Sequence, residues 1–239
     1  MRTIKEKEAR DEYCTSCIEG PNSLFGELDE DTKSLLKQTA VCKSVKKGER
    51  VYEEGNSPRG LICLISGKVK ITKKGVSGRA QIVRMAKPVG FIGYRAFFAE
   101  ENHIATAEAI EDSIICVMKT ELVFGIARSN SHFAMKIIRA LATDLGFSNR
   151  RTVTLTQKHI RGRLAESLLV LRETYGCEKD EATLKVRLSR EDLANLSNMT
   201  TSNAIRVLSQ FASEGVIALR GKEIKVLDMD LLERISYLG

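Results

Sequence analysis

The sequence predicts an α+β protein with an N-terminal antiparallel β-roll of the jelly-roll type, then a long helix, then a C-terminal winged helix-turn-helix. Three observations support this prediction. Short β-rich runs separated by glycines fill residues 45–118, a heptad-spaced stripe begins at Ala134, and two short helical patterns followed by a hairpin pattern end the chain. At 239 residues, the chain is long enough for two domains.

Glycines divide the β-rich region into short runs. A short amphipathic helix is expected before it at residues 27–39, where leucines stand among charges. Runs such as GLICLISGKVKI and DSIICVM then follow, broken by glycine at short intervals. Short apolar runs with this punctuation are typical of an antiparallel barrel or sandwich. The separating glycines are Gly48, Gly55, Gly67, Gly75, Gly90 and Gly93.

A heptad pattern follows the β-rich region. Its positions step alternately by four and three residues: Ala134, Ile138, Leu141, Leu145, Ser148, Thr152 and Leu155. A stripe with this spacing predicts a coiled-coil seam, and therefore a partner helix. The alternative is that the stripe packs on the chain's own β-roll. Ser148 and Thr152 interrupt the apolar character, so they could specify register or contact a ligand.

The C-terminal pattern is helix, turn, helix. An amphipathic helix ending at Gly176 precedes it. Ser189 is the expected N-cap of the first helix, with Asp192 placed as in a capping box, and Thr200 or Thr201 is expected to cap the second. The apolar face of the second helix consists of Ala204, Val207, Leu208 and Phe211. This arrangement lets a second helix enter the major groove of DNA.

The opposite edge of that second helix is polar. Its side chains are Thr200, Thr201, Ser202, Asn203, Arg206 and Gln210. Arginine bonds to guanine and asparagine or glutamine to adenine, while hydroxyls and helix N-termini bind phosphates. A hairpin around Gly221 and Lys222 is the expected wing. The alternative is that these residues form an ordinary solvated surface.

The order of the three modules resembles a known family. The stretch KKGERVYEEGNSPRGLICLISGKVKI resembles the cyclic-nucleotide-binding β-roll. Followed by a long helix and a winged helix-turn-helix, it resembles the family of the cyclic AMP receptor protein and the fumarate and nitrate reduction regulator (Crp/Fnr) over nearly the whole chain. The resulting division is an arm at 1–26, a β-roll at 27–128, a dimerisation helix at 129–158 and a DNA-binding domain at 159–239.

The resemblance implies a homodimeric bacterial transcription regulator. An effector in the β-roll and against the long helix would reorient the two recognition helices. Two-fold symmetry predicts an inverted repeat in double-stranded DNA, with half-sites about one helical turn apart. RNA polymerase is a further candidate partner. The competing function is an effector-binding module that acts through protein contacts.

Family positions assign roles to individual residues. Arg206 matches the arginine that reads guanine, whereas Ser202 and Thr201 stand where the family often has a glutamate and an arginine. The half-site is therefore expected to differ from the common one. Ser189, before Arg190, matches a phosphate contact, and the wing residue expected to act similarly is Lys222.

The effector-binding residues depart from the cyclic AMP pattern. Binders of that nucleotide carry Gly-Glu and then Arg-Ser, whose arginine pairs with the cyclic phosphate. Gly93 is retained, but Tyr94 replaces the glutamate and Ile104 replaces the arginine. A buried phosphate without a cation is strongly disfavoured, so cyclic AMP is not the expected effector. The remaining candidate effector-binding residues are Arg95, Ser148 and Asn149.

The cysteines suggest a second kind of input. Cys14, Cys17 and Cys116 resemble, in placement, the cluster ligands of the oxygen-sensing branch of the family, but Ser23 stands in place of the fourth cysteine. Because an iron-sulfur cluster takes four thiolates, Cys42 or another ligand would have to be recruited. The alternatives are zinc, a redox-active dithiol, or inert buried strand cysteines with Cys14 and Cys17 in a mobile arm.

The amino-acid composition limits which kinds of partner the protein is expected to bind. The formal net charge of +7 is compatible with a polyanionic partner, yet residues 151–239 hold 14 basic against 12 acidic residues, so a DNA surface must come from the placement of charge. No run of about 18 apolar residues occurs, and MRTIKEKEARDEYC lacks a signal-like stretch. A cytoplasmic protein with reduced cysteines and no membrane span is expected.

Catalysis and haem binding are not expected. The sequence carries no phosphate-binding glycine loop and no recognisable grouping of nucleophile, base and orienting residue. His103, His132 and His159 are too scattered to suggest a metal triad, so surface or hinge positions are expected for them.

Overall fold

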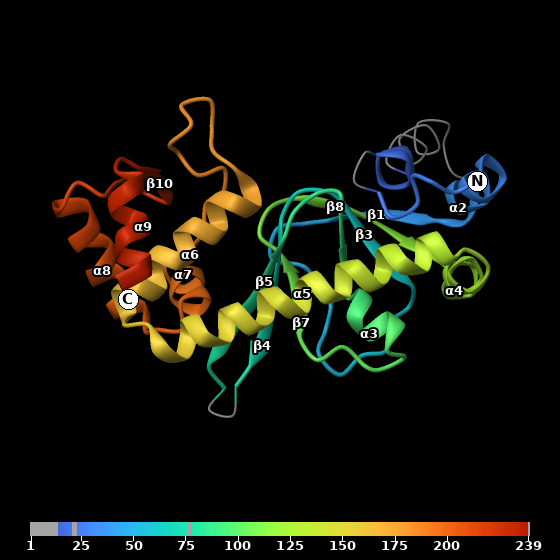
Figure 1. The fold of residues 1–239 in the computed structure, drawn as a ribbon, viewed down its shortest axis with the longest axis horizontal. Coiled ribbons are helices and arrows are strands. Elements are labelled where there is room, and N and C mark those ends of the chain that lie inside the picture. The colour runs from blue at the N-terminus through green and yellow to red at the C-terminus, as the bar shows by residue number, and fades with distance from the viewer. Residues whose placement is uncertain (1–13, 21–22, 76–77, 239) are drawn as a thin grey trace. The chain divides into compact units, whose positions relative to one another are not determined.

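The computed structural model describes residues 14–20, 23–75 and 78–238. The chain divides into two compact units, Met1–Lys73 with Ala86–Leu145 and Lys74–Met85 with Gly146–Gly239. Part of the N-terminal arm predicted at 1–26 lies outside the described residues. Figure 1 labels the elements along the chain.

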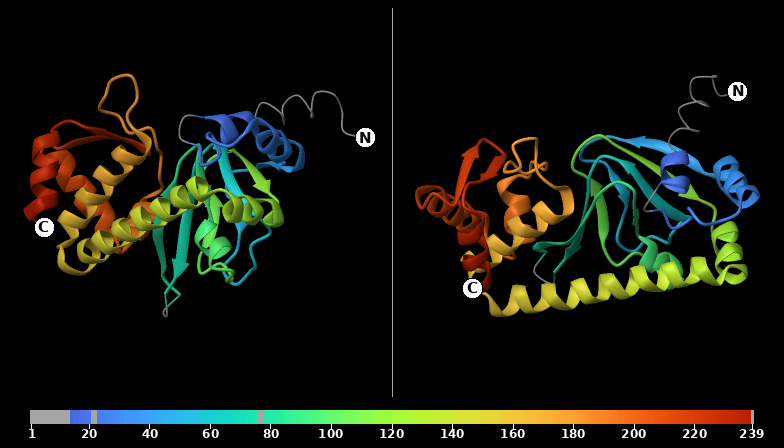
Figure 2. Two further views of the ribbon diagram at one scale, coloured as in Figure 1. Left: turned by 45° about the vertical axis from the view of Figure 1, so that its right-hand side comes forward. Right: turned by 45° about the horizontal axis from the view of Figure 1, so that its top comes forward.

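The β-roll consists of two antiparallel four-stranded sheets, which confirms the prediction from the glycine-separated runs. One sheet has the strand order β1-β8-β3-β6 and the other β2-β7-β4-β5, and Figure 2 shows them from two further sides. The strands are β1 (Val41–Val45), β2 (Arg50–Tyr52), β3 (Leu61–Ser66), β4 (Val69–Lys74), β5 (Ala80–Ala86), β6 (Gly90–Ile92), β7 (Thr106–Ala109) and β8 (Ser113–Met118).

The inner faces of these strands form an apolar core. Leu64, Ile92 and Ile115 are among its most buried members. Gly67 makes the turn between β3 and β4 possible, because its φ is +87° and a Cβ there would lie 2.2 Å from Ser113 Oγ. Only glycine combines this conformation with so close an approach.

The short helices α2 (Glu30–Thr39), α3 (Tyr94–Phe98) and α4 (Thr120–Ser129) accompany the strands, in addition to a helical segment at residues 14–19. The first confirms the predicted amphipathic helix, and Asp29 caps it by accepting a hydrogen bond of 2.8 Å from the Thr32 amide. Helix α3 was not predicted from the sequence, because five residues within an apolar run are too few to display a helical period.

The long helix α5 (Ser131–Gln157) carries the predicted heptad stripe. Phe133 and Ile137 belong to a buried cluster in the first unit, where Phe133 stacks on Phe25 with ring centroids 5.2 Å apart. Ile138 and Leu145, in contrast, are 55% and 63% exposed. These two stripe residues therefore remain largely outside the chain's own core.

After the end of α5, the described part of the C-terminal unit contains α6 (Ile160–Tyr175), α7 (Arg190–Leu196), α8 (Thr201–Ser213) and α9 (Met229–Leu238), and a hairpin of β9 (Ile217–Arg220) and β10 (Glu223–Val226). Helix α6 packs against α9, and α7 packs against α8. Gly176 is the C-cap of α6, as predicted, and its amide donates a 2.8 Å hydrogen bond to the Arg172 carbonyl. The hairpin confirms the predicted wing.

Candidate nucleic-acid interface and effector-domain sites

Side-chain caps fix the helix-turn-helix. Ser189 Oγ accepts a 2.9 Å hydrogen bond from the Asp192 amide, as the capping pattern predicts. Asn198 makes the turn with φ +49°, a conformation that asparagine tolerates better than most residues. Thr200 then caps α8 by accepting a 3.2 Å hydrogen bond from the Asn203 amide, which decides between the two predicted threonines.

Helix α8 has one buried and one exposed side. Ala204, Val207, Leu208 and Phe211 are buried, as predicted. Thr201, Ser202 and Arg206 are exposed, and Asn203 and Gln210 are partly exposed. Arg206 Nη2 donates a 3.2 Å hydrogen bond to Asn203 Oδ1, so these two side chains lie together on the helix surface.

Ile205 also belongs to this surface, although the sequence did not predict it. Its side chain is 47% exposed. The missed signal is that position 205 falls outside the apolar stripe formed by Ala204, Val207 and Leu208. An apolar side chain at this place can contact the methyl group of thymine.

The other predicted DNA contacts lie on α7 and the wing. The Ser189 hydroxyl serves as the helix cap, and Arg190 Nη2 donates a 2.9 Å hydrogen bond to the Gly221 carbonyl at the wing turn. Arg190 therefore connects α7 to the wing. Lys222 is exposed beside that turn.

Two contacts stabilise the C-terminal end of α8. Arg161 forms a bidentate ion pair with Glu214, with N–O distances of 2.8 and 2.6 Å. The guanidinium of Arg161 also lies 5.0 Å from the centre of the Phe211 ring. Arg161, Arg206 and Gln210 border one surface hollow together with residues of α9.

A buried polar contact stabilises the end of α7. Ser197 Oγ and Ser167 Oγ are 2.9 Å apart, and both residues are fully buried. Arg151, which is 7% exposed, donates a hydrogen bond to the Leu196 carbonyl. Burial lowers the pKa of Arg151 to about 10, against a smaller opposing effect of Glu166, so the guanidinium stays charged at neutral pH.

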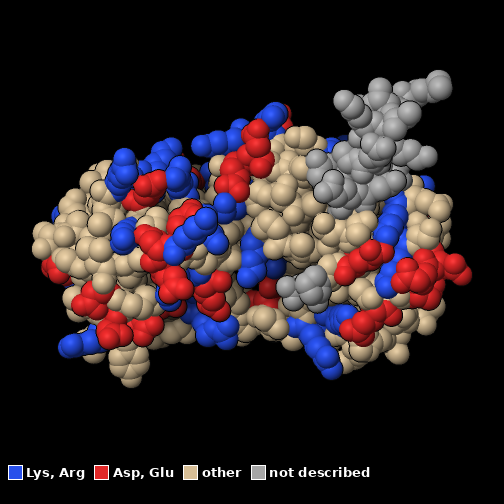
Figure 3. Space-filling view, turned by 90° about the horizontal axis from the view of Figure 1, so that it is seen from above, with Lys and Arg blue, Asp and Glu red and all other residues tan. Residues whose placement is uncertain are grey.

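The surface charge is mixed in sign. Figure 3 shows lysine and arginine interspersed with aspartate and glutamate on one face of the molecule. Within the C-terminal unit, Arg187 forms an ion pair with Glu223, and Lys225 forms one with Asp180.

The predicted effector residues in the β-roll adopt a defined arrangement. Gly93 caps α3 with φ +70°, and a Cβ there would lie 2.8 Å from the His103 ring. Tyr94 is buried, and its hydroxyl donates a 2.5 Å hydrogen bond to Asp144 Oδ2 on α5. Asp144 was not among the predicted residues, and no sequence pattern marks it.

The remaining effector candidates lie on the surface. Arg95 is exposed and forms a 2.9 Å ion pair with Glu101. Ser148 and Asn149 are exposed on α5 and belong to the C-terminal unit.

The surface or hinge position expected for His103 is wrong. Its side chain is only 5% exposed and stacks on Tyr52 with ring centroids 3.8 Å apart. Burial, with a smaller effect of the charge of Arg95, lowers the pKa of His103 below its usual value. His132 and His159 are exposed, as expected.

The cysteines differ from expectation in two ways. Cys14 and Cys17 are fully buried in a helical segment at residues 14–19, so they do not lie in a mobile arm. Two disulfides, Cys17–Cys63 and Cys42–Cys116, occur within the described residues, although reduced cysteines were expected. The composition alone could not place these side chains next to one another.

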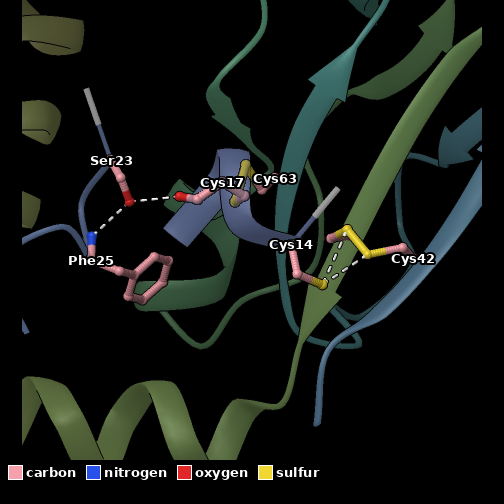
Figure 4. Close-up of a disulfide and its surroundings, with 7 residues drawn as sticks. Cys14, Cys17, Ser23, Phe25, Cys42 and Cys63 are labelled. Carbon is pink, nitrogen blue, oxygen red and sulfur yellow. Dashed lines mark hydrogen bonds between the residues drawn. A yellow bond between two sulfur atoms is a disulfide. The ribbon is translucent and has the colours of Figure 1, made fainter. Parts of the chain in front are cut away.

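Strand register explains why the sulfurs meet. Cys116 on β8 pairs with Cys42 on β1 and with Cys63 on β3, so the three cysteines form one row across the sheet. Directly paired residues project from the same face of a sheet. Cys14 Sγ lies 3.2 Å from Cys42 Sγ and 3.9 Å from Cys116 Sγ. Figure 4 draws Cys14 beside the disulfide that Cys42 forms.

Ser23 does not replace the missing cluster ligand. Its hydroxyl donates a 2.6 Å hydrogen bond to the Cys17 carbonyl and accepts a 3.0 Å hydrogen bond from the Phe25 amide. In Figure 4 these bonds lie on the side of the segment away from the Cys14 sulfur. The four-ligand set of the oxygen-sensing branch therefore does not fit this chain.

Comparison with known proteins agrees with this architecture. Residues 42–130 match the family model of the cyclic nucleotide-binding domain, and residues 162–235 match that of the Crp-like helix-turn-helix domain. The fold and the recognition helix together define a DNA-binding transcription regulator with an effector-type domain. The chain belongs to the Crp/Fnr family of transcription regulators.

Individual relatives are distant but similar over most of their length. The transcriptional regulatory protein btr of Bordetella pertussis is 24% identical, and the match covers 93% of each chain. A CRP-like cAMP-activated global transcriptional regulator of Mycobacterium tuberculosis is 27% identical over 88% of this chain and 95% of its own. The structure of FixK2 from Bradyrhizobium japonicum is 23% identical with a TM-score of 0.75, covering 82% of this chain and 97% of that chain.

The described residues include no helix that is both long and apolar enough to cross a membrane.

Proposed function

We propose that this protein is a homodimeric regulator in which each α8 reads one half of an inverted repeat in double-stranded DNA. The observation that carries the proposal is the exposed polar edge of α8, where Arg206 and Asn203 are joined by a hydrogen bond of 3.2 Å. Arginine and asparagine on an exposed helix face are the side chains that form bidentate hydrogen bonds to guanine and adenine.

The side chains on this edge match the chemistry of base recognition. Arg206 is assigned to guanine, Asn203 and Gln210 to adenine, and Ile205 to a thymine methyl group. Thr200, Thr201 and Ser202 lie at the helix N-terminus, where hydroxyls and amides favour phosphate. Lys222 on the wing adds a phosphate contact that is independent of sequence.

Dimerisation is assigned to α5. Ile138 and Leu145 expose more than half of their side chains, and burying them against the same helix of a second chain is favourable. Ser148 and Thr152 are exposed in the second half of the stripe, where polar groups can fix the register of a helix pair. A two-fold dimer would present its α8 helices about one turn of DNA apart.

Cyclic AMP is not the proposed effector. Tyr94 occupies the family position of the glutamate that binds ribose, and its hydroxyl already binds Asp144. Arg95 is exposed and paired with Glu101, so it is a poor partner for a buried cyclic phosphate. The proposed function therefore includes an effector domain that responds to a different signal.

A binding experiment tests DNA recognition. A palindrome selected from random DNA should bind wild-type protein, and Arg206→Ala should weaken that binding by about 1–3 kcal/mol. Arg128→Ala is the matched control, because Arg128 is an exposed arginine on α4, remote in sequence from the helix-turn-helix. Equal affinity of the two variants would instead favour the competing function, an effector module that acts through protein contacts.

A second experiment tests the dimer. Leu145→Asp should convert the protein to monomers in analytical ultracentrifugation and reduce its affinity for the full palindrome. Leu35→Asp is the control, because Leu35 is 46% exposed on α2, away from the stripe. A dimer that survives Leu145→Asp but not Leu35→Asp would place the interface elsewhere.

A second candidate function is redox sensing through Cys14, Cys17 and Cys116, with DNA binding as the output. It is favoured by the burial of these cysteines beside Cys42 and Cys63. Ser23 argues against the iron-sulfur arrangement of the oxygen-sensing branch, so the thiol form is preferred. Anaerobic purification followed by native mass spectrometry and an iron assay tests this preference, and iron-loaded protein would reverse it.

A further inference from the structure

A surface hollow lies beside the recognition helix α8. Residues from the start of α6, from α8 and from α9 line it, and its volume is about 520 Å³. All three helices belong to the C-terminal unit, where α6 packs against both α8 and α9, and Figure 1 labels them. Pockets for small organic ligands usually have volumes of about 300–1,000 Å³. The hollow is therefore of a size that accepts a small molecule.

One wall of the hollow is apolar. It consists of one residue of α6 and three of α9: Ile160, Leu231, Ile235 and Leu238. The three α9 residues are spaced by four and three positions, so they form a stripe along one side of that helix. Leu238 is 76% exposed, whereas Leu232 on another side of α9 is fully buried. Helix α9 therefore carries apolar surface that the described part of the chain does not cover.

The polar wall of the hollow is basic. Arg206 on α8 and Arg234 on α9 both line it, and none of the described residues that line it is acidic. Arg161 lines it as well, but Glu214 already neutralises its charge. In the part of the chain that the structure describes, neither Arg206 nor Arg234 has a carboxylate partner. Guanidinium groups of this kind bind carboxylate and phosphate through paired hydrogen bonds.

We propose that the hollow binds a small amphiphilic anion, in which an apolar chain carries a carboxylate or phosphate head group. The head group binds Arg206 and Arg234, and the chain lies on the apolar stripe of α9. A neutral or cationic molecule would cover the stripe but leave both guanidinium groups without a counter-charge.

The position of the hollow gives this ligand a regulatory effect. Arg206 is assigned to guanine and also lines the hollow, so the ligand and DNA compete for the same guanidinium. A bound ligand therefore releases the protein from its DNA site. This regulatory step rests on the proposed function of α8, whereas ligand binding itself does not.

Calorimetric titration of the full-length protein in the absence of DNA tests the binding site. Decanoate and monodecyl phosphate, both kept below the concentrations at which they form micelles, distinguish the two head groups. At least one of them should bind with about one molecule per chain. Decyltrimethylammonium has the same chain with the opposite charge, and inorganic phosphate has no chain. Each of these two should bind at least about tenfold more weakly.

Paired variants locate the bound amphiphile. Arg234→Ala should weaken its binding at least about tenfold, because a charge-assisted hydrogen bond is lost. Arg128→Ala removes an exposed arginine from α4 and should leave binding unchanged. Leu238→Ser should weaken binding at least about threefold, because apolar contact is lost. Tyr237→Ser is its matched control, since Tyr237 is 86% exposed and lies outside the hollow.

Competition with DNA tests the regulatory step. At a free concentration ten times its own dissociation constant, the amphiphile should raise the dissociation constant of wild-type protein for the selected palindrome about tenfold. Arg234→Ala protein should still bind the palindrome when no amphiphile is present. It should need at least about tenfold more amphiphile for the same loss of DNA binding.

Several results would overturn the proposal. Neither amphiphile could bind, or decyltrimethylammonium or inorganic phosphate could bind as tightly, or Arg234→Ala and Arg128→Ala could behave alike. An amphiphile that binds in the hollow and leaves DNA affinity unchanged would overturn the competition. Protein that binds the amphiphile but no DNA sequence would support the binding site and contradict the proposed function, so the two failures are distinguishable.

Discussion

The recognition helix and the cysteine cluster present their chemistry in opposite ways. On α8, Arg206 projects into solvent, and its chemistry is completed only by a partner outside the chain. In the first unit, Cys14 on the helical segment and Cys116 on β8 are fully buried, and the Cys14 sulfur lies close to the sulfurs of Cys42 and Cys116. The first region is accessible to a partner molecule, and the second is enclosed within the chain.

This difference determines which kind of site can be predicted from the sequence. An exposed site on a helix follows from the helical period, because the period separates the inward from the outward side chains. A buried site made from several strands depends on the register in which the strands pair. The hydrophobic period of the sequence does not specify that register.

Thiol reactivity should show the largest contrast between buried and accessible groups. In non-reducing buffer, Cys177, which is partly exposed, should react with a thiol-alkylating reagent at least about a hundredfold faster than Cys14. A buried thiol reacts only after local opening, and an opening cost of about 3 kcal/mol gives this factor. Mass spectrometry of the time course measures both rates, and equal rates would mean that the cluster is open in solution.

The buried side of α8 should show the next largest effect. Phe211→Ala should lower the free energy of unfolding by about 3–5 kcal/mol, because it removes a fully buried ring beneath Arg161. Ile205→Ala, on the exposed side of the same helix, should change it much less. Urea denaturation measures both, and similar losses for the two would contradict the assignment of the faces.

The cap of α8 should show the smallest effect. Thr200→Ala should cost about 1 kcal/mol of stability, because it removes the acceptor for the Asn203 amide. Thr201→Ala is the matched control, since Thr201 is exposed and lies one residue inside the helix. A greater loss from Thr201→Ala would mean that the helix begins one residue later.

Much of the fold could be predicted from sequence for local reasons. The caps Ser189, Thr200 and Gly176 and the buried stripe of α8 depend on residues within one or two helical turns of each other. The candidate DNA-binding edge followed from the same local pattern. Ile205 was missed because a single apolar residue off the stripe carries a weak signal.

The remaining features depend on contacts between distant parts of the chain. His103 is buried because Tyr52, 51 positions earlier, stacks on it. Tyr94 meets Asp144 across 50 positions, and Cys14 meets Cys116 across 102. Neither periodicity nor composition encodes such pairings, and the expectation of reduced cysteines was wrong.

The central claim is that the exposed edge of α8 reads bases. The most direct measurement compares wild type, Arg206→Ala and Lys222→Ala on every single-base variant of the selected palindrome. We predict that Arg206→Ala loses discrimination at one base pair in each half-site. Lys222→Ala should weaken binding to all sequences alike. It should also lower the slope of the salt dependence of binding by about one, which corresponds to one lost phosphate contact. Identical base profiles for all three proteins would contradict the account.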